Sequence, residues 1–220
     1  MQIKVATPET AEWDAAVRIV REKYRKAFAA DVHPHPDRFV VCLEDDGPQP
    51  RAVACAGLTF SRQTPLFSEA YLDTPAHRAI GQQEGQPVAR EAVLEVGALA
   101  SVSYRAGTEL IRALPLLCWC LGKRYILCTA TRPLRALFED VGICFTPLVQ
   151  ADPQRLDAGA LAAWGSYYRQ SPQTGFVSLE QMSRQFGRFT GRYSFFNPVV
   201  QLAEPQPQPQ RQPETPHAFA

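Results

Sequence analysis

The stretch VAREAVLEVGALA, residues 88–100, indicates a buried strand on which the predicted fold of this chain depends. Residues 92–100 within it form an apolar run of the length of a buried strand, interrupted by one ionisable side chain, Glu95. A carboxylate there costs free energy unless it is paired or protonated. We therefore expect Glu95 either to form an ion pair, with Arg90 or Arg62, or to have a raised pKa in a cleft, where it could accept a proton from an amine.

The elements after this strand alternate between helix and strand. Residues 107–121 are predicted to form a helix and residues 124–130 an apolar strand. A second helix is predicted over residues 134–141, with Pro133 in its first turn and Gly142 as its stop, followed by a strand over 143–148. Because consecutive strand–helix–strand units favour parallel pairing, the sequence predicts a partly parallel sheet.

Upstream of residue 88 the pattern is typical of an antiparallel region. Residues 3–6 are predicted as a short strand, and residues 7–10 supply caps for a helix over 11–28. Residues 38–44 and 52–60 read as a hairpin around the polar turn DDGPQP. His33 and His35 each precede a proline and are interpreted as loop residues. Residues 68–80 are interpreted as a segment broken by turns.

Two regions of different composition divide the chain. Residues 1–202 are long enough for one domain with a substantial core. Residues 203–220, AEPQPQPQRQPETPHAFA, are rich in proline and glutamine, with almost no aliphatic side chains. Such a segment cannot bury enough surface to offset its ordering entropy, so we expect a disordered tail.

Composition excludes several classes of function. With 23 basic and 22 acidic side chains, the chain carries no charge excess that would favour nucleic acid. No apolar run approaches the roughly 20 residues of a membrane helix, and the N-terminus lacks a signal-peptide core, so we expect a cytoplasmic protein without integral membrane association. The six cysteines lack the paired spacing of a zinc site, and we expect buried structural thiols and no metal.

Three segments resemble the thermostable haemolysin family, which is similar in fold to acyl-homoserine-lactone synthases and to GNAT-type N-acyltransferases. They are LFSEAYLDTPAH at 66–77, VAREAVLEVGALA at 88–100 and WGSYYRQSPQTGFV at 164–177. The family reads close to F-L-E-Q-Y-L-D, R-x-x-I-V-E-V-G-N-L-A and W-G-x-Y-Y. The positions that match are Glu69, Tyr71, Leu72, Asp73, Arg90, Glu95, Gly97, Trp164, Gly165, Tyr167 and Tyr168.

The resemblance covers roughly residues 15–180 and implies a fold, a reaction and its substrates. The implied fold is α/β, with a mixed, centrally splayed sheet flanked by helices. The implied reaction transfers an acyl group from a phosphopantetheine thioester, either acyl-CoA or acyl-carrier protein, to a small-molecule amine. Such a reaction would serve the synthesis of a small or lipid-like metabolite.

Site residues follow from the same resemblance. Glu95 would deprotonate or position the amine, Glu69 would hold it, and Tyr168 or Tyr167 would protonate the leaving thiolate. The donor would bind at Gly97, Leu99, Arg105, Gly107 and Thr108. The amine pocket would include Arg62, Tyr71, Asp73 and Trp164. We expect Trp164, Tyr167 and Tyr168 to share one face of a helix, where packing is the simpler role for Trp164.

The sequence also departs from these families at chemically relevant positions. Phe138 stands where GNAT enzymes often carry a proton-donating tyrosine, and Ala98 replaces the usual asparagine of the E-V-G-N motif. The loop before the helix at 107–121 is poor in glycine. These departures keep open an alternative: a non-catalytic membrane-active or ligand-binding protein on the same fold.

Overall fold

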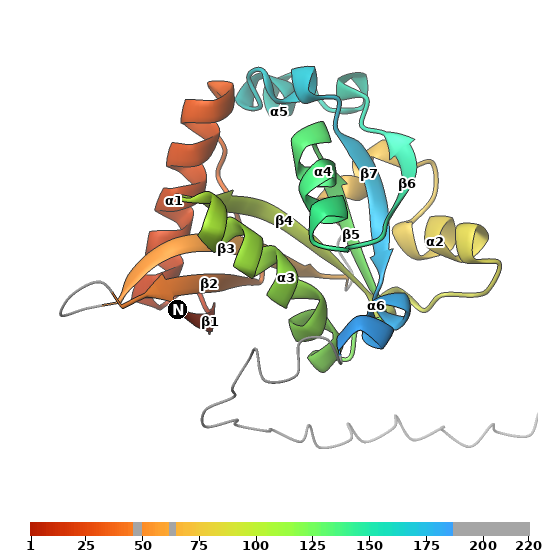
Figure 1. Ribbon diagram of the computed structural model, residues 1–220. Helices are drawn as coiled ribbons and strands as arrows, with labels where there is room; N and C mark the ends of the chain where they lie inside the picture. Colours follow the sequence, from red (N-terminus) through yellow and green to blue (C-terminus); the bar gives the residue numbers. More distant parts are fainter. Residues whose placement is uncertain (46–49, 62–64, 187–220) are drawn as a thin grey trace, which may run out of the picture. The chain divides into compact units, whose positions relative to one another are not determined.

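The computed structural model describes residues 1–45, 50–61 and 65–186. Seven strands of this region form one sheet in the order β1-β2-β3-β4-β5-β7-β6 (Figure 1). They are β1 Gln2–Ala6, β2 Arg38–Glu44, β3 Arg51–Phe60, β4 Val93–Ser101, β5 Tyr125–Ala130, β6 Phe145–Gln150 and β7 Gln173–Ser178. Neighbouring strands are antiparallel except β4 and β5, which are parallel. The predicted mixed sheet is confirmed.

Helices cover both faces of the sheet. They are α1 Ala11–Phe28, α2 Ala76–Glu84, α3 Tyr104–Cys120, α4 Arg132–Asp140, α5 Ala158–Ala163 and α6 Leu179–Phe186. Short 3-10 turns lie at η1 Phe67–Tyr71, η2 Arg90–Ala92, η3 Pro153–Arg155 and η4 Tyr167–Gln170. Figure 1 shows α3 and α4 in front of the sheet. The layers are helix, sheet and helix, as expected for an α/β fold.

Alternation of side chains along β2 fixes which helix packs on which face. Phe39 and Val41 are buried in the cluster that includes α1, whereas Val40 and Cys42 join the cluster under α3. Successive side chains of a strand point to opposite faces, so an apolar run such as RFVVCLE must be covered on both. Helix α1 and helix α3 therefore lie on opposite faces of the N-terminal half of the sheet.

The sheet divides in the middle, between β4 and β5. These strands pair only from Val93 to Glu95, opposite Tyr125 to Leu127. Beyond that point β4 continues along β3 to Ser101, while β5 continues along β7 to Ala130. The divergence can be followed in Figure 1, and it makes Glu95 the last β4 residue paired with β5. The predicted central splay is confirmed.

A bulge in β4 accompanies the divergence. The register between β3 and β4 shifts between Cys55 and Gly57, and Ala98 opposite this shift has φ 47°. A left-handed residue in a bulge bends the strand and increases its twist. Asparagine tolerates this conformation better than most residues, so the usual asparagine of the motif has a conformational explanation here. No role for an amide needs to be invoked at Ala98.

Several predicted boundaries were wrong. Helix α3 begins at Tyr104, because the Ser103 side chain accepts a hydrogen bond from the Ala106 N–H and caps it. Gly107 is therefore inside the helix and not in a loop. The segment expected to be broken by turns over residues 68–80 contains the turn η1 and, from Ala76, the first residues of helix α2; strand β7 was not predicted. The tail over 203–220 lies outside the described residues.

The helix expected to carry Trp164, Tyr167 and Tyr168 is also wrong. Helix α5 ends at Ala163, and a separate 3-10 turn begins at Tyr167. Gly165 between them has φ +51°, which an α-helix cannot accommodate. Its neighbour Ser166 donates through N–H to the Phe28 carbonyl at 2.7 Å, which fastens this corner to the end of α1.

Two further expectations concern the burial of the cysteines and the absence of a membrane-spanning helix. Cys42, Cys55, Cys118 and Cys128 are buried free thiols, whereas Cys120 and Cys144 are exposed. Burial raises the pKa of each of the four buried thiols to about 12. Among the described residues, no helix has both the length and the apolarity to cross a bilayer.

We predict that Gly165→Ala destabilises the protein by at least about 2 kcal/mol, because the new Cβ would need both a left-handed backbone and space already filled. That Cβ would overlap the Phe28 carbonyl oxygen. Gly122→Ala is the matched control, since Gly122 has φ +73° but nothing within 4 Å of the added Cβ. Urea unfolding should show about 1 kcal/mol for the control. Equal losses in both variants would contradict the close packing of this corner.

Candidate active site

Glu95 is buried at the point where β4 and β5 part, and backbone groups of η1 hold its carboxylate. Only 6% of the surface of Glu95 is exposed. The Phe67 N–H donates to Oε2 at 2.8 Å, and the Ser68 N–H donates to Oε1 at 2.9 Å. The Ser68 hydroxyl donates to the same Oε1 at 2.5 Å. The ion pair considered for Glu95 with Arg90 is absent, because Arg90 bonds to Glu69 instead.

Burial raises the pKa of Glu95 above its ordinary value. The hydrogen bonds from Ser68 and Phe67 oppose this shift by stabilising the ionised form, and the nearby charge of Glu69 adds to it. A carboxylate with a raised pKa is a stronger base than a solvated one. The raised-pKa alternative for Glu95 is the one that the structure supports. Arg62 lies outside the described residues.

A chain of hydroxyl groups leads from Glu95 across the divided sheet. Ser68 Oγ lies 2.8 Å from Thr129 Oγ1, and Thr129 Oγ1 lies 2.7 Å from Thr174 Oγ1 on the neighbouring strand β7. Each hydroxyl has one proton to donate. When Glu95 is ionised and accepts from Ser68, Thr129 must donate to Ser68 and Thr174 to Thr129. The chain then has one direction, toward the carboxylate.

Two cavities meet at the splay, one on each face of the sheet. The apolar cavity, about 410 Å³, lies mainly between β4, β5, α3 and α4, where Leu110, Leu134 and Phe138 line it, and it also reaches Tyr24 and Phe28 of α1. The Glu95 cavity, about 730 Å³, lies on the opposite face, between α1, η1, the His33–Pro36 loop and the α5–η4 corner. The residues that line both are Tyr24, Val96, Gly97, Ala98, Thr129 and Tyr167.

Gly97 lies at the junction of the two cavities and leaves it open. A Cβ built on Gly97 would have nothing within 4 Å. The glycine therefore adds no side chain to a space that both cavities share. Leu99, two residues further along β4, lines the apolar cavity alone. Gly97 and Leu99, two of the five predicted donor residues, thus border the apolar cavity, while Glu95 borders the other.

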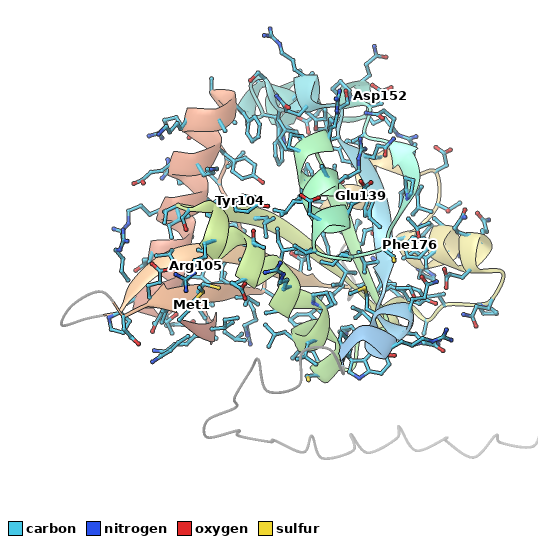
Figure 2. All side chains as sticks on the ribbon, viewed as in Figure 1. Met1, Tyr104, Arg105, Glu139, Asp152 and Phe176 are labelled. Carbon is cyan, nitrogen blue, oxygen red and sulfur yellow. The ribbon has the colours of Figure 1, made fainter. Side chains whose placement is uncertain are left out.

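Of the donor residues predicted at the start of α3, Gly107 and Thr108 are buried and Arg105 is exposed. Gly107 lines the apolar cavity, and a Cβ there would lie 2.7 Å from Ser101 Oγ. The Thr108 hydroxyl donates to the Tyr104 carbonyl at 2.9 Å, within the helix. Arg105 is exposed beside Tyr104, in the first turn of α3 (Figure 2). Neither Arg105 nor Thr108 lines the cavity as described.

Glu69 stands behind the site rather than in it. Arg90 donates to its two carboxylate oxygens at 3.0 and 3.2 Å. The Leu66 and Ala76 N–H groups donate at 2.8 and 2.7 Å. Burial opposes ionisation of Glu69, but Arg90 and these N–H groups outweigh it and hold its pKa below the usual value. Glu69 does not line the Glu95 cavity, so its geometry is that of a clip on the η1 loop.

Tyr71 and Tyr168 form a hydroxyl pair, with the two oxygens 2.6 Å apart. Tyr71 lines the Glu95 cavity, whereas Tyr168 does not line either cavity. Tyr167 lines both, and its hydroxyl donates to the Thr129 carbonyl at 3.2 Å. Burial raises the pKa of Tyr167 well above the ordinary value. Of the two tyrosines predicted as a proton source, Tyr167 is the one at the junction.

Of two further residues predicted for the amine pocket, Asp73 and Trp164, only Trp164 lines the Glu95 cavity. Asp73 pairs with Arg155 at 2.8 Å on the surface, away from both cavities. Trp164 lines the Glu95 cavity and packs against Tyr167, with ring centroids 4.9 Å apart.

Sequence reasoning missed several residues of the site. Ser68 and Thr129 carry the hydroxyl chain, and Tyr24 lines both cavities. His33 and His35 line the Glu95 cavity, although they were interpreted as loop residues only. Ser68 stands where the family motif F-L-E-Q-Y-L-D has its first leucine, and this departure was the one available signal. A threonine in a strand, such as Thr129, is too common to attract attention.

The family model described as thermostable hemolysin matches residues 6–183. The chain belongs to the thermostable hemolysin family. This hemolysin-family protein therefore carries its motifs where the sheet divides, at η1, at β4 and at the α5–η4 corner. The comparison with curated proteins finds no significant match.

Solved structures similar to this hemolysin-family protein share its fold at low identity. FeeM, an N-acyl amino acid synthase from uncultured soil microbes, has a TM-score of 0.54 and 15% identity, covering 84% of this chain and 99% of FeeM. The AHL synthase LasI has 0.54 and 9%, covering 81% and 89%. BjaI, a CoA-dependent acyl-homoserine lactone synthase solved with SAM and isopentyl-CoA, has 0.53 and 13%, covering 93% and 94%. The GNAT-like fold is confirmed.

We predict that Glu69→Gln lowers the free energy of unfolding by roughly 2 kcal/mol at pH 7, because it breaks a mostly buried ion pair. A carboxylate whose folded pKa is lowered stabilises the fold above its unfolded pKa, and this contribution disappears as pH falls through the folded pKa. The difference between wild type and variant should therefore shrink below about pH 4. Urea unfolding of wild type and variant at pH 7 and below about pH 4 measures this difference in the free energy of unfolding.

Asp73→Asn is the matched control for this measurement, since its carboxylate is 88% exposed in a surface pair. We expect a change within about 0.5 kcal/mol. A Glu69→Gln variant as stable as this control at pH 7 would contradict the role of Glu69 as a clip.

Proposed function

We propose that this hemolysin-family protein is an N-acyltransferase that moves an acyl group from a phosphopantetheine thioester to an amine. The observation that carries the proposal is the meeting of two cavities at Gly97 and Thr129, one apolar and one containing the buried Glu95. A thioester and an amine that enter from opposite faces would meet at this junction. The fold that the chain shares with FeeM and the acyl-homoserine lactone synthases supports the same reaction.

The reaction exchanges one bond at the acyl carbon. The amine nitrogen attacks the thioester carbonyl, a C–N bond forms and the C–S bond breaks. The proton lost by the nitrogen passes to the ionised Glu95, and the sulfur leaves as a thiolate that takes up a proton. The products are an amide and a free pantetheine thiol, and no oxidant or reductant is needed.

The apolar cavity suits the donor. Its lining of Leu110, Leu134 and Phe138 can cover an acyl chain or the pantetheine arm. Backbone N–H groups near Gly97 and Leu99 would polarise the carbonyl as charge develops on its oxygen. Acyl-CoA and acyl-carrier protein both present the same arm, so both remain candidate donors.

The hydroxyl chain gives Glu95 a path to the junction. Thr129 lines both cavities, and Ser68 links it to the carboxylate through contacts of 2.8 and 2.5 Å. A proton released at the nitrogen would enter at Thr129 Oγ1 while Thr129 and Ser68 each pass their own proton one step toward Glu95. Tyr167, which keeps its proton because its pKa is raised, would donate a hydrogen bond to the leaving thiolate, and the proton that the sulfur takes up would come from solvent.

We predict that Glu95→Gln lowers turnover at least about a hundredfold while the fold is kept. Because burial raises the pKa of Glu95, the wild-type rate should fall with decreasing pH at a midpoint above 4.5, and the variant should lose this acid limb. Free-thiol release from acyl-CoAs and acyl-carrier proteins with a panel of amines measures both. Full activity in Glu95→Gln would remove Glu95 from the mechanism.

We also predict that Thr129→Val lowers turnover by roughly tenfold or more, since it removes the hydroxyl but keeps the branched shape. Thr129→Ser keeps the hydroxyl and should retain most activity. Thr174→Val, at the far end of the chain, should have a smaller effect than Thr129→Val. Equal rates for Thr129→Val and Thr129→Ser would show that the proton does not travel through Thr129.

The alternative, a membrane-active or ligand-binding protein without catalysis, is favoured by Phe138, which lines the apolar cavity without a hydroxyl. Thermal-shift measurements with short- and long-chain acyl-CoAs and acyl-carrier proteins separate the two. Stabilisation by a thioester is expected for the transferase. No stabilisation, together with lysis of lipid vesicles by the protein alone, would support the alternative.

A further inference from the structure

We infer that the acceptor is a primary amine on an aromatic or similarly flat apolar body, without a carboxylate beside the nitrogen. This inference rests on the proposed function and names the substrate class of the Glu95 cavity. It is carried by the aromatic rings that line this cavity, together with the two acidic side chains that line it, Asp31 and Glu95. The aromatic residues that line it are Tyr24, Phe67, Tyr71, Trp164 and Tyr167.

The size of the cavity excludes a small polar amine as its natural fit. A volume of about 730 Å³ is of the size that holds drug-sized molecules. A ligand of a few atoms would bury little of this surface and leave the rings in contact with water. The free energy of binding must therefore come from the body that carries the amine.

The rings form a continuous wall from the surface to the junction. Phe67 lies at the outer end, with 44% of its surface exposed, and its ring centroid is 5.4 Å from that of Trp164. Trp164 packs on Tyr167 at 4.9 Å, and Tyr167 reaches the Thr129 carbonyl. An apolar body lying along this wall would place its nitrogen near Thr129 and Glu95. Phe67 joins both functions, because its N–H also holds the Glu95 carboxylate.

The charges in the cavity favour an ammonium group and disfavour a carboxylate. Among the described residues that line it, the acidic side chains are Asp31 and Glu95, and no lysine or arginine is present. Aromatic faces attract cations as well. Asp31 also lies 3.6 and 3.8 Å from Arg21 and Arg25, so Glu95 is the acid available to the nitrogen. An α-amino acid would bring its carboxylate toward this acid.

The test compares phenethylamine with ethylamine and phenylalanine, which lack the ring and add a carboxylate, respectively. Calorimetric titration without donor measures binding, and free-thiol release measures transfer. We expect phenethylamine to bind and react at least about tenfold better than either. Phe67→Ala should reduce this preference by about tenfold while its backbone N–H still holds Glu95.

Trp119→Ala is the matched control, since Trp119 is a similarly exposed aromatic residue, at 40%, that does not line the Glu95 cavity. It should leave the preference within about twofold. Transfer to ethylamine or phenylalanine that equals or exceeds transfer to phenethylamine would overturn the inference and leave the proposed reaction standing. Binding of phenethylamine that depends on Phe67, with no transfer from any thioester, would overturn the proposed reaction. It would leave standing the inference that the Glu95 cavity binds an aromatic amine.

Discussion

The divided pairing of β4 is the constraint on which the rest of the structure depends. The strand follows β5 for three residues and then stays with β3, and a bulge at Ala98 accompanies the divergence. Backbone groups past Glu95 on this edge have no parallel partner strand to bond. Such an opening inside a sheet is normally costly. Here it produces two cavities that meet through the sheet rather than at its edge.

Glu95 lies where this opening begins, and several elements hold its carboxylate in place. The η1 turn brings two N–H groups and one hydroxyl to the carboxylate. The Glu69–Arg90 pair and the bond from Ala76 in turn hold η1 in place. The buried carboxylate of Glu95 is stabilised by backbone donors, and that of Glu69 is stabilised by the Arg90 cation. The two glutamates therefore have pKa values shifted in opposite directions.

The family motifs acquire physical meanings once they are placed in the fold. In E-x-Y the glutamate fastens η1 and the tyrosine bonds to Tyr168. In E-V-G the acid and the open glycine border the junction. In W-G-x-Y-Y the glycine allows a close approach to the end of α1, which sets Trp164 and Tyr167 into the cavity wall. Structural and chemical positions are thus mixed within each motif, and resemblance alone cannot separate them.

The sequence by itself determined the α/β class, the buried carboxyl of β4 and most element boundaries, such as α1 over residues 11–28. Alternation of apolar residues and capping side chains are local signals, and they survive without tertiary context. Only the tertiary structure decided that Arg90 bonds to Glu69 and not to Glu95, and that Ser68 and Thr129 meet. These partners are separated by 21 and 61 positions. Contacts at such separations depend on how strands pair and diverge, which no local pattern records.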